Sequence, residues 1–134
     1  MKNQPTILIP MLREYCIKLP DEPGQMATLC EALAKENVNL LTACALTATG
    51  AVVAIVTEDA EKTTAVLDGF GHEYHSSEVL QVSVPHKPGS LAAISRTMAN
   101  AGINIRSLYI MSKDEDSAII AFTVDDTDAA REMI

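Results

Sequence analysis

The sequence contains no tryptophan, few other aromatic residues and few basic ones. Two phenylalanines and three tyrosines leave the core to be built mainly from aliphatic side chains. Ten lysines and arginines stand against eighteen acidic residues, and the formal net charge is −8. Such a chain lacks the positive surface that binds nucleic acids or acidic membranes. We therefore expect neither a nucleic acid nor a membrane among its partners.

Cysteine is also scarce, and no long apolar run occurs. The three cysteines, Cys16, Cys30 and Cys44, show no paired spacing, so we infer no disulfide and expect small buried thiols. The apolar run 7–9 is interrupted by Pro10 and is too short for a signal peptide or a membrane span. These absences predict a cytoplasmic protein. A composition of 48% hydrophobic and 21% charged residues is typical of a globular one.

The sequence contains one short motif twice. Residues 21–26 read Asp-Glu-Pro-Gly-Gln-Met, and residues 86–91 read His-Lys-Pro-Gly-Ser-Leu. Each copy lies between a strand-like apolar run and an amphipathic run of helical period, so each predicts a tight strand-to-helix turn. Free backbone amides at the start of a helix attract a carboxylate or another anion. A single Pro-Gly pair is usually only part of a turn, but two copies in matching contexts indicate a functional turn.

The elements around the motif repeat in the same order. The first copy predicts a strand at 12–19, a helix at 25–36, a hairpin of strands at 38–48 and 51–58, a helix at 60–70 and a short strand at 73–77. The second predicts a strand at 80–84, a helix, a hairpin with a solvated acidic turn at 114–116, and a last helix after Asp126. We match strand 118–122 to 52–56, which makes the second hairpin one residue longer.

The two helices of the motif have matching apolar stripes. Leu29 and Leu33 lie on the first stripe, and Leu91 and Met98 lie on the second, so both stripes are expected in the core. Asn37 and Gly102 follow the two helices at positions where a left-handed cap is needed.

This plan gives a first unit at 12–77, a second unit at 78–134 and an N-terminal extension at 1–11. The second unit lacks the last strand of the first. A sheet without its edge strand exposes unpaired backbone groups. We therefore expect segment 6–11 to occupy the vacant position as an added edge strand, in its own chain or in a partner's. The alternative is a chain cut short after Ile134.

The residues around both turns resemble the ACT domain family. In the first copy the turn and helix are followed by Asn-Val-Asn-Leu at 37–40, which opens the hairpin. The second copy, with Ala-Gly-Ile-Asn-Ile at 101–105, is closer still to the family pattern, and the two cover roughly residues 12–134. The resemblance implies an α+β fold of two tandem ferredoxin-like βαββαβ units. Their antiparallel sheets would each be packed by helices on one face, and the second unit would lack its last strand.

The resemblance also implies a function. ACT-like units bind small molecules, commonly amino acids, where the turn of one unit meets the start of the second strand of its neighbour. Carried over to this chain, the ligand-binding residues would be Asp21, Glu22, Gly24, Gln25, Met26, Asn39, Leu40, Lys87, Gly89, Ser90, Leu91, Asn104 and Ile105. The chemistry of the residues agrees, because amides at 24–26 or 89–91 can hold a carboxylate and Asp21 or Glu22 can receive an ammonium.

Several alternatives stay open at this point. The first turn is acidic and the second basic, so the two should not bind one ligand equally well, and the sequence names neither the ligand nor the occupied turn. Asn39 and Asn104 can instead be structural residues that cap the turn before a strand. His72 and His75 suggest a metal-responsive sensor, although convincing metal sites need three or more ligands. We predict no cofactor and no metal.

The leading interpretation is a non-enzymatic regulatory protein that binds an amino acid at the interface between its units. No nucleophile motif and no phosphate-binding loop occurs, so no catalytic residue is predicted. A homodimer is expected because two small sheets leave outer edges for a two-fold partner, and a regulated enzyme is a further possible partner. The alternative from another class is a structural oligomerisation module without a ligand.

Overall fold

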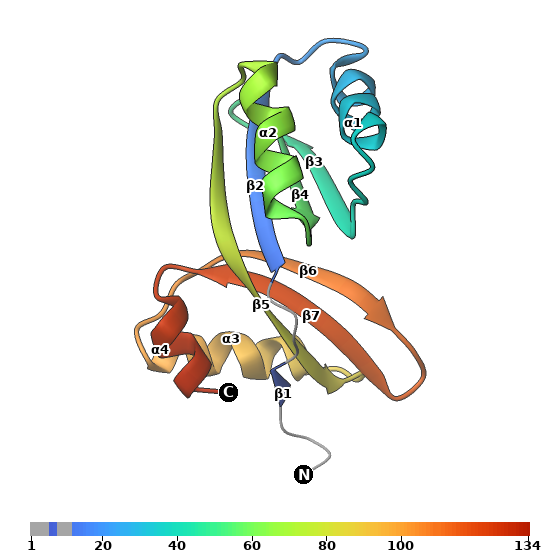
Figure 1. The fold of residues 1–134 in the computed structure, drawn as a ribbon. Helices are drawn as coiled ribbons and strands as arrows, with labels where there is room; N and C mark the ends of the chain where they lie inside the picture. Colours follow the sequence, from blue (N-terminus) through green and yellow to red (C-terminus); the bar gives the residue numbers. More distant parts are fainter. Residues whose placement is uncertain (1–5, 8–11) are drawn as a thin grey trace. The chain divides into compact units, whose positions relative to one another are not determined.

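A computed structural model describes residues 6–7 and 12–134, which form an α+β fold (Figure 1). The strands are β1 (Thr6–Ile7), β2 (Leu12–Leu19), β3 (Thr42–Thr47), β4 (Ala51–Thr57), β5 (Tyr74–Pro85), β6 (Ile105–Lys113) and β7 (Ser117–Val124). The helices are α1 (Gln25–Lys35), α2 (Ala60–Phe70), α3 (Ser90–Asn100) and α4 (Thr127–Glu132). Each strand pair with a described register is antiparallel. The α+β class with antiparallel pairing is as predicted.

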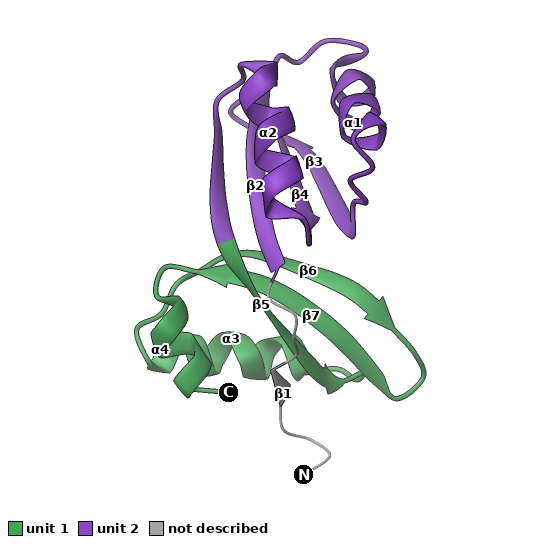
Figure 2. Cartoon of the chain, in the orientation of Figure 1, with its two compact units in different colours: residues 1–11, 78–134 green, residues 12–77 purple. Residues whose placement is uncertain are grey.

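The chain divides into two compact units (Figure 2). Residues 12–77 form the N-terminal unit, and residues 78–134 with β1 form the C-terminal unit. Strand β5 contributes its residues up to Ser77 to the first and the rest to the second. The strand order is β3-β4-β2-β5 in the N-terminal unit and β5-β7-β6 in the C-terminal unit, where β1 also pairs with β5.

The core of the N-terminal unit lies between one face of its sheet and two helices. Alternation along β2 places every second residue on this face, and β4 contributes Val53 and Ile55 to the same face. Leu29 and Leu33 of α1 cover it together with Leu67 of α2. The left-handed cap predicted at Asn37 is confirmed by its positive φ of 61°. At the start of α2 the Asp59 side chain accepts a hydrogen bond from the Lys62 amide at 3.0 Å.

The C-terminal unit has a similar core. Leu80, Val82 and Val84 of β5 share a buried face with Ile120 and Phe122 of β7, and helices α3 and α4 cover it. The α3 residues in this core are Ile94 and Met98. Gly102 follows α3 with a φ of 74°, which confirms the left-handed cap.

Two expectations about strands were wrong. The segments 73–77 and 80–84 were expected as separate strands, but β5 runs without a break from Tyr74 to Pro85. No glycine or proline occurs between Tyr74 and Val84, so nothing in the backbone interrupts the extended chain. The strand expected at 38–48 starts later, at Thr42.

The alignment of the two hairpins was also wrong. In the N-terminal unit Ile17 pairs with Val53. Val82 precedes the second turn by as many residues as Ile17 precedes the first, and it pairs with Ile120. Ile120 therefore corresponds to Val53 and not to Ala54. The cause is a register shift in β6 between Ile110 and Ser112. This shift adds one residue to the hairpin, besides the residue by which its turn is longer. A slip of one residue exchanges the two faces of a strand.

The segment 6–11 is described only at β1. Thr6 pairs with Ser83 and Ile7 pairs with Val82, so β1 lies beside β5. In the N-terminal unit the corresponding place beside β2 is taken by the first residues of β5. The rest of the expected added strand, residues 8–11, lies outside the described residues.

Candidate functional site

The two strand-to-helix turns have the same backbone geometry. The Glu22 amide donates to the Pro20 carbonyl at 2.9 Å, and the Lys87 amide donates to the Pro85 carbonyl at 3.0 Å. Gly24 has a φ of 89° and Gly89 a φ of 95°, and each caps the following helix. A Cβ at either glycine would meet nothing within 4 Å, so glycine is required here by the backbone conformation and not by space.

The first turns of α1 and α3 offer unused donors. Neither helix has a side-chain cap. The first helical bonds run from the Thr28 amide to the Gly24 carbonyl and from the Ala93 amide to the Gly89 carbonyl, both at 2.9 Å. Among the described residues, the amides of Met26 and Leu91 have no hydrogen-bond partner. Amides of this kind favour an anionic group.

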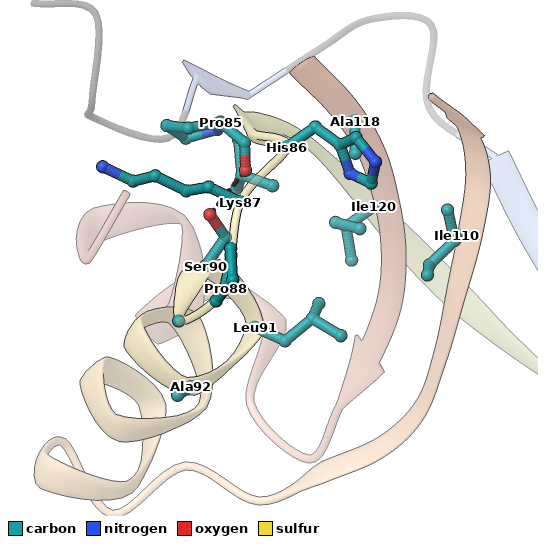
Figure 3. A pocket seen from close by; sticks show the side chains of 12 residues that line it. Pro85, His86, Lys87, Pro88, Ser90, Leu91, Ala92, Ile110, Ala118 and Ile120 are labelled. Carbon is teal, nitrogen blue, oxygen red and sulfur yellow. Dashed lines mark hydrogen bonds between the residues drawn. The ribbon is translucent and has the colours of Figure 1, made fainter. Parts of the chain in front are cut away.

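A cavity of about 440 Å³ adjoins the second turn (Figure 3). Its inner wall is made of buried residues of β5 and β7, namely Val84, Ala118 and Ile120. Leu91 of α3 points toward Ile120 and Ile110, and the imidazole of His86 lies on this same side. Lys87 points away from them. The turn thus has an apolar cavity beside it, with His86 at the edge.

Two hydrogen bonds hold this turn in place. The Ser90 hydroxyl donates to the Pro85 carbonyl at 2.5 Å, and the His86 amide donates to the Asp116 carbonyl at 2.9 Å. The second bond joins the turn to the exposed hairpin tip at 114–116, which is a solvated turn as expected. In that tip the amides of Ser117 and Asp116 lower the pKa of the Asp114 carboxyl, with a smaller contribution from the charge of His86.

The structure brings together some of the predicted site residues. Lys87, Gly89, Ser90 and Leu91 all line the cavity. Asn104 and Ile105 lie beyond the other end of α3, whose 11 residues rise by about 16 Å. There the Asn104 amide donates to the Asp125 side chain at 3.0 Å, and the Asp125 amide donates to the Asn104 carbonyl at 3.2 Å. Both bonds use the backbone of Asn104, so the two alternatives for its side chain stay predictions.

The N-terminal unit shows the same separation. Asp21, Glu22 and Gly24 are exposed at the turn, while Gln25 and Met26 are half-buried at the start of α1. Asn39 lines a polar hollow with residues 58–62, and Leu40 packs against the core at the far end of α1. In neither unit do the turn and the start of the second strand meet. The expected site between neighbouring units stays a prediction.

The predicted site includes four of the twelve residues that line the cavity. Among the eight that it lacks, His86 lies in the motif itself, and Ile110, Ala118 and Ile120 belong to the hairpin of β6 and β7. Ala118 pairs with Val84 just before the turn, so a correct register would have found it. The incorrect alignment placed it on the wrong face. Leu91 was also expected in the core, but it is 38% exposed at the cavity mouth.

Other candidate groups do not form a site. His72 lies against the Phe70 ring, with centroids 5.5 Å apart, and His75 is exposed on β5. In the described part of the chain, no three or more histidines, cysteines and carboxylates lie close enough to hold a metal. The Cys16 thiol donates to Glu14 Oε1 at 3.3 Å, and burial raises its pKa to about 12, so it is a poor nucleophile. Cys44 is exposed on the edge strand β3, which contradicts the expectation of a buried thiol.

Comparison with known proteins gives a family match within the C-terminal unit. Residues 79–132 match the model of the ACT domain family. The chain is 31% identical over 86 residues to an aspartokinase of Corynebacterium efficiens, an alignment that covers 63% of this chain and 20% of that enzyme. The chain thus matches about one fifth of the length of this curated relative. No helix among the described residues is long and apolar enough to cross a membrane.

Solved structures show the same fold over most of the chain. A protein from Bacteroides thetaiotaomicron matches with a TM-score of 0.77 and 22% identity, over 92% of this chain and 85% of that one. The ligand-free regulatory subunit of aspartate kinase from Thermus thermophilus matches with a TM-score of 0.69 and 17% identity, over 96% and 93% of the two chains. The ACT-like character predicted from the second turn is confirmed for residues 79–132.

Proposed function

We propose that this chain is a tandem of two ACT units that binds an amino acid and regulates a partner without catalysing a reaction itself. The observation that carries the proposal is the turn of the ACT domain at 79–132. Its Leu91 amide has no partner among the described residues and lies beside an apolar cavity. Residues 12–77 support the tandem, because they repeat the same turn bonds and the same strand pairing.

The turn supplies the chemistry that an amino acid needs. The amides at 89–91 can hold its carboxylate, and the cavity can hold its side chain. In the first unit the exposed carboxylates Asp21 and Glu22 offer a partner for an ammonium group. The first turn therefore offers a partner for each charged group of a zwitterion, since its own amides can hold a carboxylate.

The site requires more than one unit. Because the turn and the start of the second strand lie at opposite ends of a helix, a ligand that touches both must bridge neighbouring units. Residues 39–40 and 104–105 would then come from the neighbour. We propose a homodimer in which ligand binding favours one arrangement of the units, and a regulated enzyme that responds to the change. The neighbour from Thermus thermophilus, a regulatory subunit of aspartate kinase, is an example of such a partnership.

Strand β1 has a part in this plan. Its pairing with β5 supports the proposal that the N-terminal segment takes the place of the missing last strand of the second unit. Deleting residues 1–11 should then lower the stability of the C-terminal unit. Unchanged stability and an unchanged oligomeric state would exclude this role.

The test is thermal unfolding of extensively dialysed protein with each of the twenty amino acids. A ligand at a hundred times its Kd adds about 2.7 kcal/mol, which shifts the midpoint by several degrees. Gly89→Val should abolish the response and leave assembly intact if the ligand binds at the second turn, and Gly24→Val should do so if it binds at the first. A flat panel, or loss of assembly alone in Gly89→Val, would support the structural oligomerisation module instead.

A further inference from the structure

We infer that the cavity at the second turn selects an amino acid with a branched or long aliphatic side chain and excludes one with a charged side chain. The inference rests on the proposed function, because it assigns the ligand class of the same site. It is carried by the residues that line the cavity and by their positions around it. All of them belong to the C-terminal unit.

The wall of the cavity is aliphatic. Val84, Ala118 and Ile120 form its buried inner side, and Leu91 and Ile110 stand at its mouth. None of these side chains has a polar atom. A charged ligand side chain placed against them would lose its water without gaining a partner, which strongly disfavours binding. An aliphatic side chain would instead remove apolar surface from water on both sides of the contact.

The mouth of the cavity exposes apolar surface that a ligand can cover. Four large hydrophobic residues of the described chain are exposed, namely Leu46, Leu91, Ile110 and Met133. Two of these, Leu91 at 38% and Ile110 at 54%, line this one cavity, and Leu91 points toward Ile110 (Figure 3). The register shift in β6 begins at Ile110, and bulges of this kind redirect side chains beside functional sites.

Polar groups occur only on the turn side of the cavity, which fixes the direction of the ligand. The His86 imidazole lies there and can donate a hydrogen bond, and so can the Leu91 amide. The Ser90 hydroxyl already donates to the Pro85 carbonyl. Lys87 points away, so it is not the carboxylate partner in this cavity. The carboxylate of the ligand lies at the turn, and its side chain extends toward Ile120.

The first turn does not have the same wall. Ala45 pairs with Val53 in the first unit, and Ile110 pairs with Ile120 at the corresponding position of the second. The methyl group of Ala45 therefore replaces the larger side chain of Ile110. Asp21 stands in the motif where the second copy has His86. The aliphatic ligand should therefore bind once per chain, at the second turn.

The experiment is isothermal titration of the dialysed full chain with L-leucine, L-valine, L-alanine and L-lysine. Each buried methylene tightens binding about fourfold. Since the cavity is open, we expect leucine to bind at least about tenfold more tightly than alanine, one molecule per chain, and lysine to give no heat.

Two single substitutions make the test specific. Ile110→Ala should weaken leucine binding about tenfold and leave alanine binding unchanged, because only the longer side chain reaches the mouth. Leu46→Ala is the matched control, since Leu46 is an exposed aliphatic residue of the other unit and should not affect leucine binding. Both positions are on the surface, and circular dichroism verifies that both variants are folded.

The outcomes separate this inference from the proposed function. Alanine or lysine binding as tightly as leucine, abolished by Gly89→Val but unaffected by Ile110→Ala, would overturn the aliphatic selection and leave amino-acid binding at the turn intact. Equal losses of leucine binding in Ile110→Ala and Leu46→Ala would also overturn it. No heat with any of the four amino acids, together with a flat thermal panel, would overturn both.

Discussion

The turns of the two units have the same hydrogen bonds and the same left-handed glycine, yet they present different surroundings. The N-terminal turn carries two exposed carboxylates, and strand β3 of the same unit contributes Ala45. Around the C-terminal turn lie His86 and Lys87, and the strand beyond it offers Ile110. The backbone provides a place for an anion in both units, and the neighbouring side chains decide which molecule can use it.

The largest effects should come from the two cores. Leu33 and Met98 occupy corresponding positions in α1 and α3 and are fully buried. Leu33→Ala and Met98→Ala should each lower the free energy of unfolding by about 2–5 kcal/mol, because each leaves a cavity. Hydrogen exchange should show faster opening in the unit that carries the substitution. Equal acceleration in both units by either variant would contradict separate cores.

The next effect concerns the turn glycines. Gly24→Ala and Gly89→Ala should each cost about 1–2 kcal/mol, because an L-residue is strained at a φ of 89° or 95° although space is free. Urea unfolding gives both values. If only one of the two variants loses stability, the positive φ is not the reason for glycine at the other position.

These glycines illustrate how much the sequence could predict. Turns, caps and helix faces depend on residues close in the chain, so the turn at Gly24 and the cap at Asn37 could be assigned from local pattern alone. The cavity depends on which residue of β6 faces which residue of β7. The residue added after Ile110 could not be recognised from the hydrophobic periodicity of the sequence, because it changes the pairing of β6 with β7 and not the composition of the strand.

Leu91 shows a second limit of the sequence. A helical stripe indicates which side chains share a face, and in α3 it correctly placed Met98 in the core. Whether the first residue of the stripe is covered depends on the element opposite to it. Leu91 lies at an open cavity, so the burial predicted for the whole stripe is wrong for its first residue.

A smaller effect is expected at the caps of the second helices of the two units. Asp59 accepts from the Lys62 amide at 3.0 Å, and Asp126 accepts from the Ala129 amide at 3.1 Å. Replacing either by alanine should cost about 1 kcal/mol, since a helix amide loses its acceptor. Asparagine at the same position is the control and should cost much less. If the asparagine variants lose as much as the alanine variants in urea unfolding, the side-chain cap is not the cause.

The smallest effect is a pH dependence of stability, which we expect at the C-terminal hairpin turn but not at the N-terminal one. Asp114 accepts from the amides of Ser117 and Asp116, and these bonds lower its pKa below the usual 3.8. The unfolded chain therefore takes up the proton first as pH falls. The contribution of Asp114 is complete above its unfolded pKa and is lost as pH drops through the lower folded value. The N-terminal hairpin turn, residues 48–50, has no carboxylate.

Amide chemical shifts of Ser117 between pH 2 and 6 should follow this titration. In Asp114→Asn the Ser117 shift should become independent of pH over this range. A Ser117 shift that still titrates in the variant would mean that another carboxylate is responsible.

The register shift in β6 has one more consequence, which concerns association between sheets. Strands β3 and β6 are the outer strands of the described sheet order. Every residue from Thr42 to Thr47 pairs in sequence with β4, so β3 presents a regular row of backbone groups to any further strand. In β6 that spacing is interrupted at two places. An approaching strand would find continuous pairing along β3 but not along β6, so association through a sheet edge is favoured at β3.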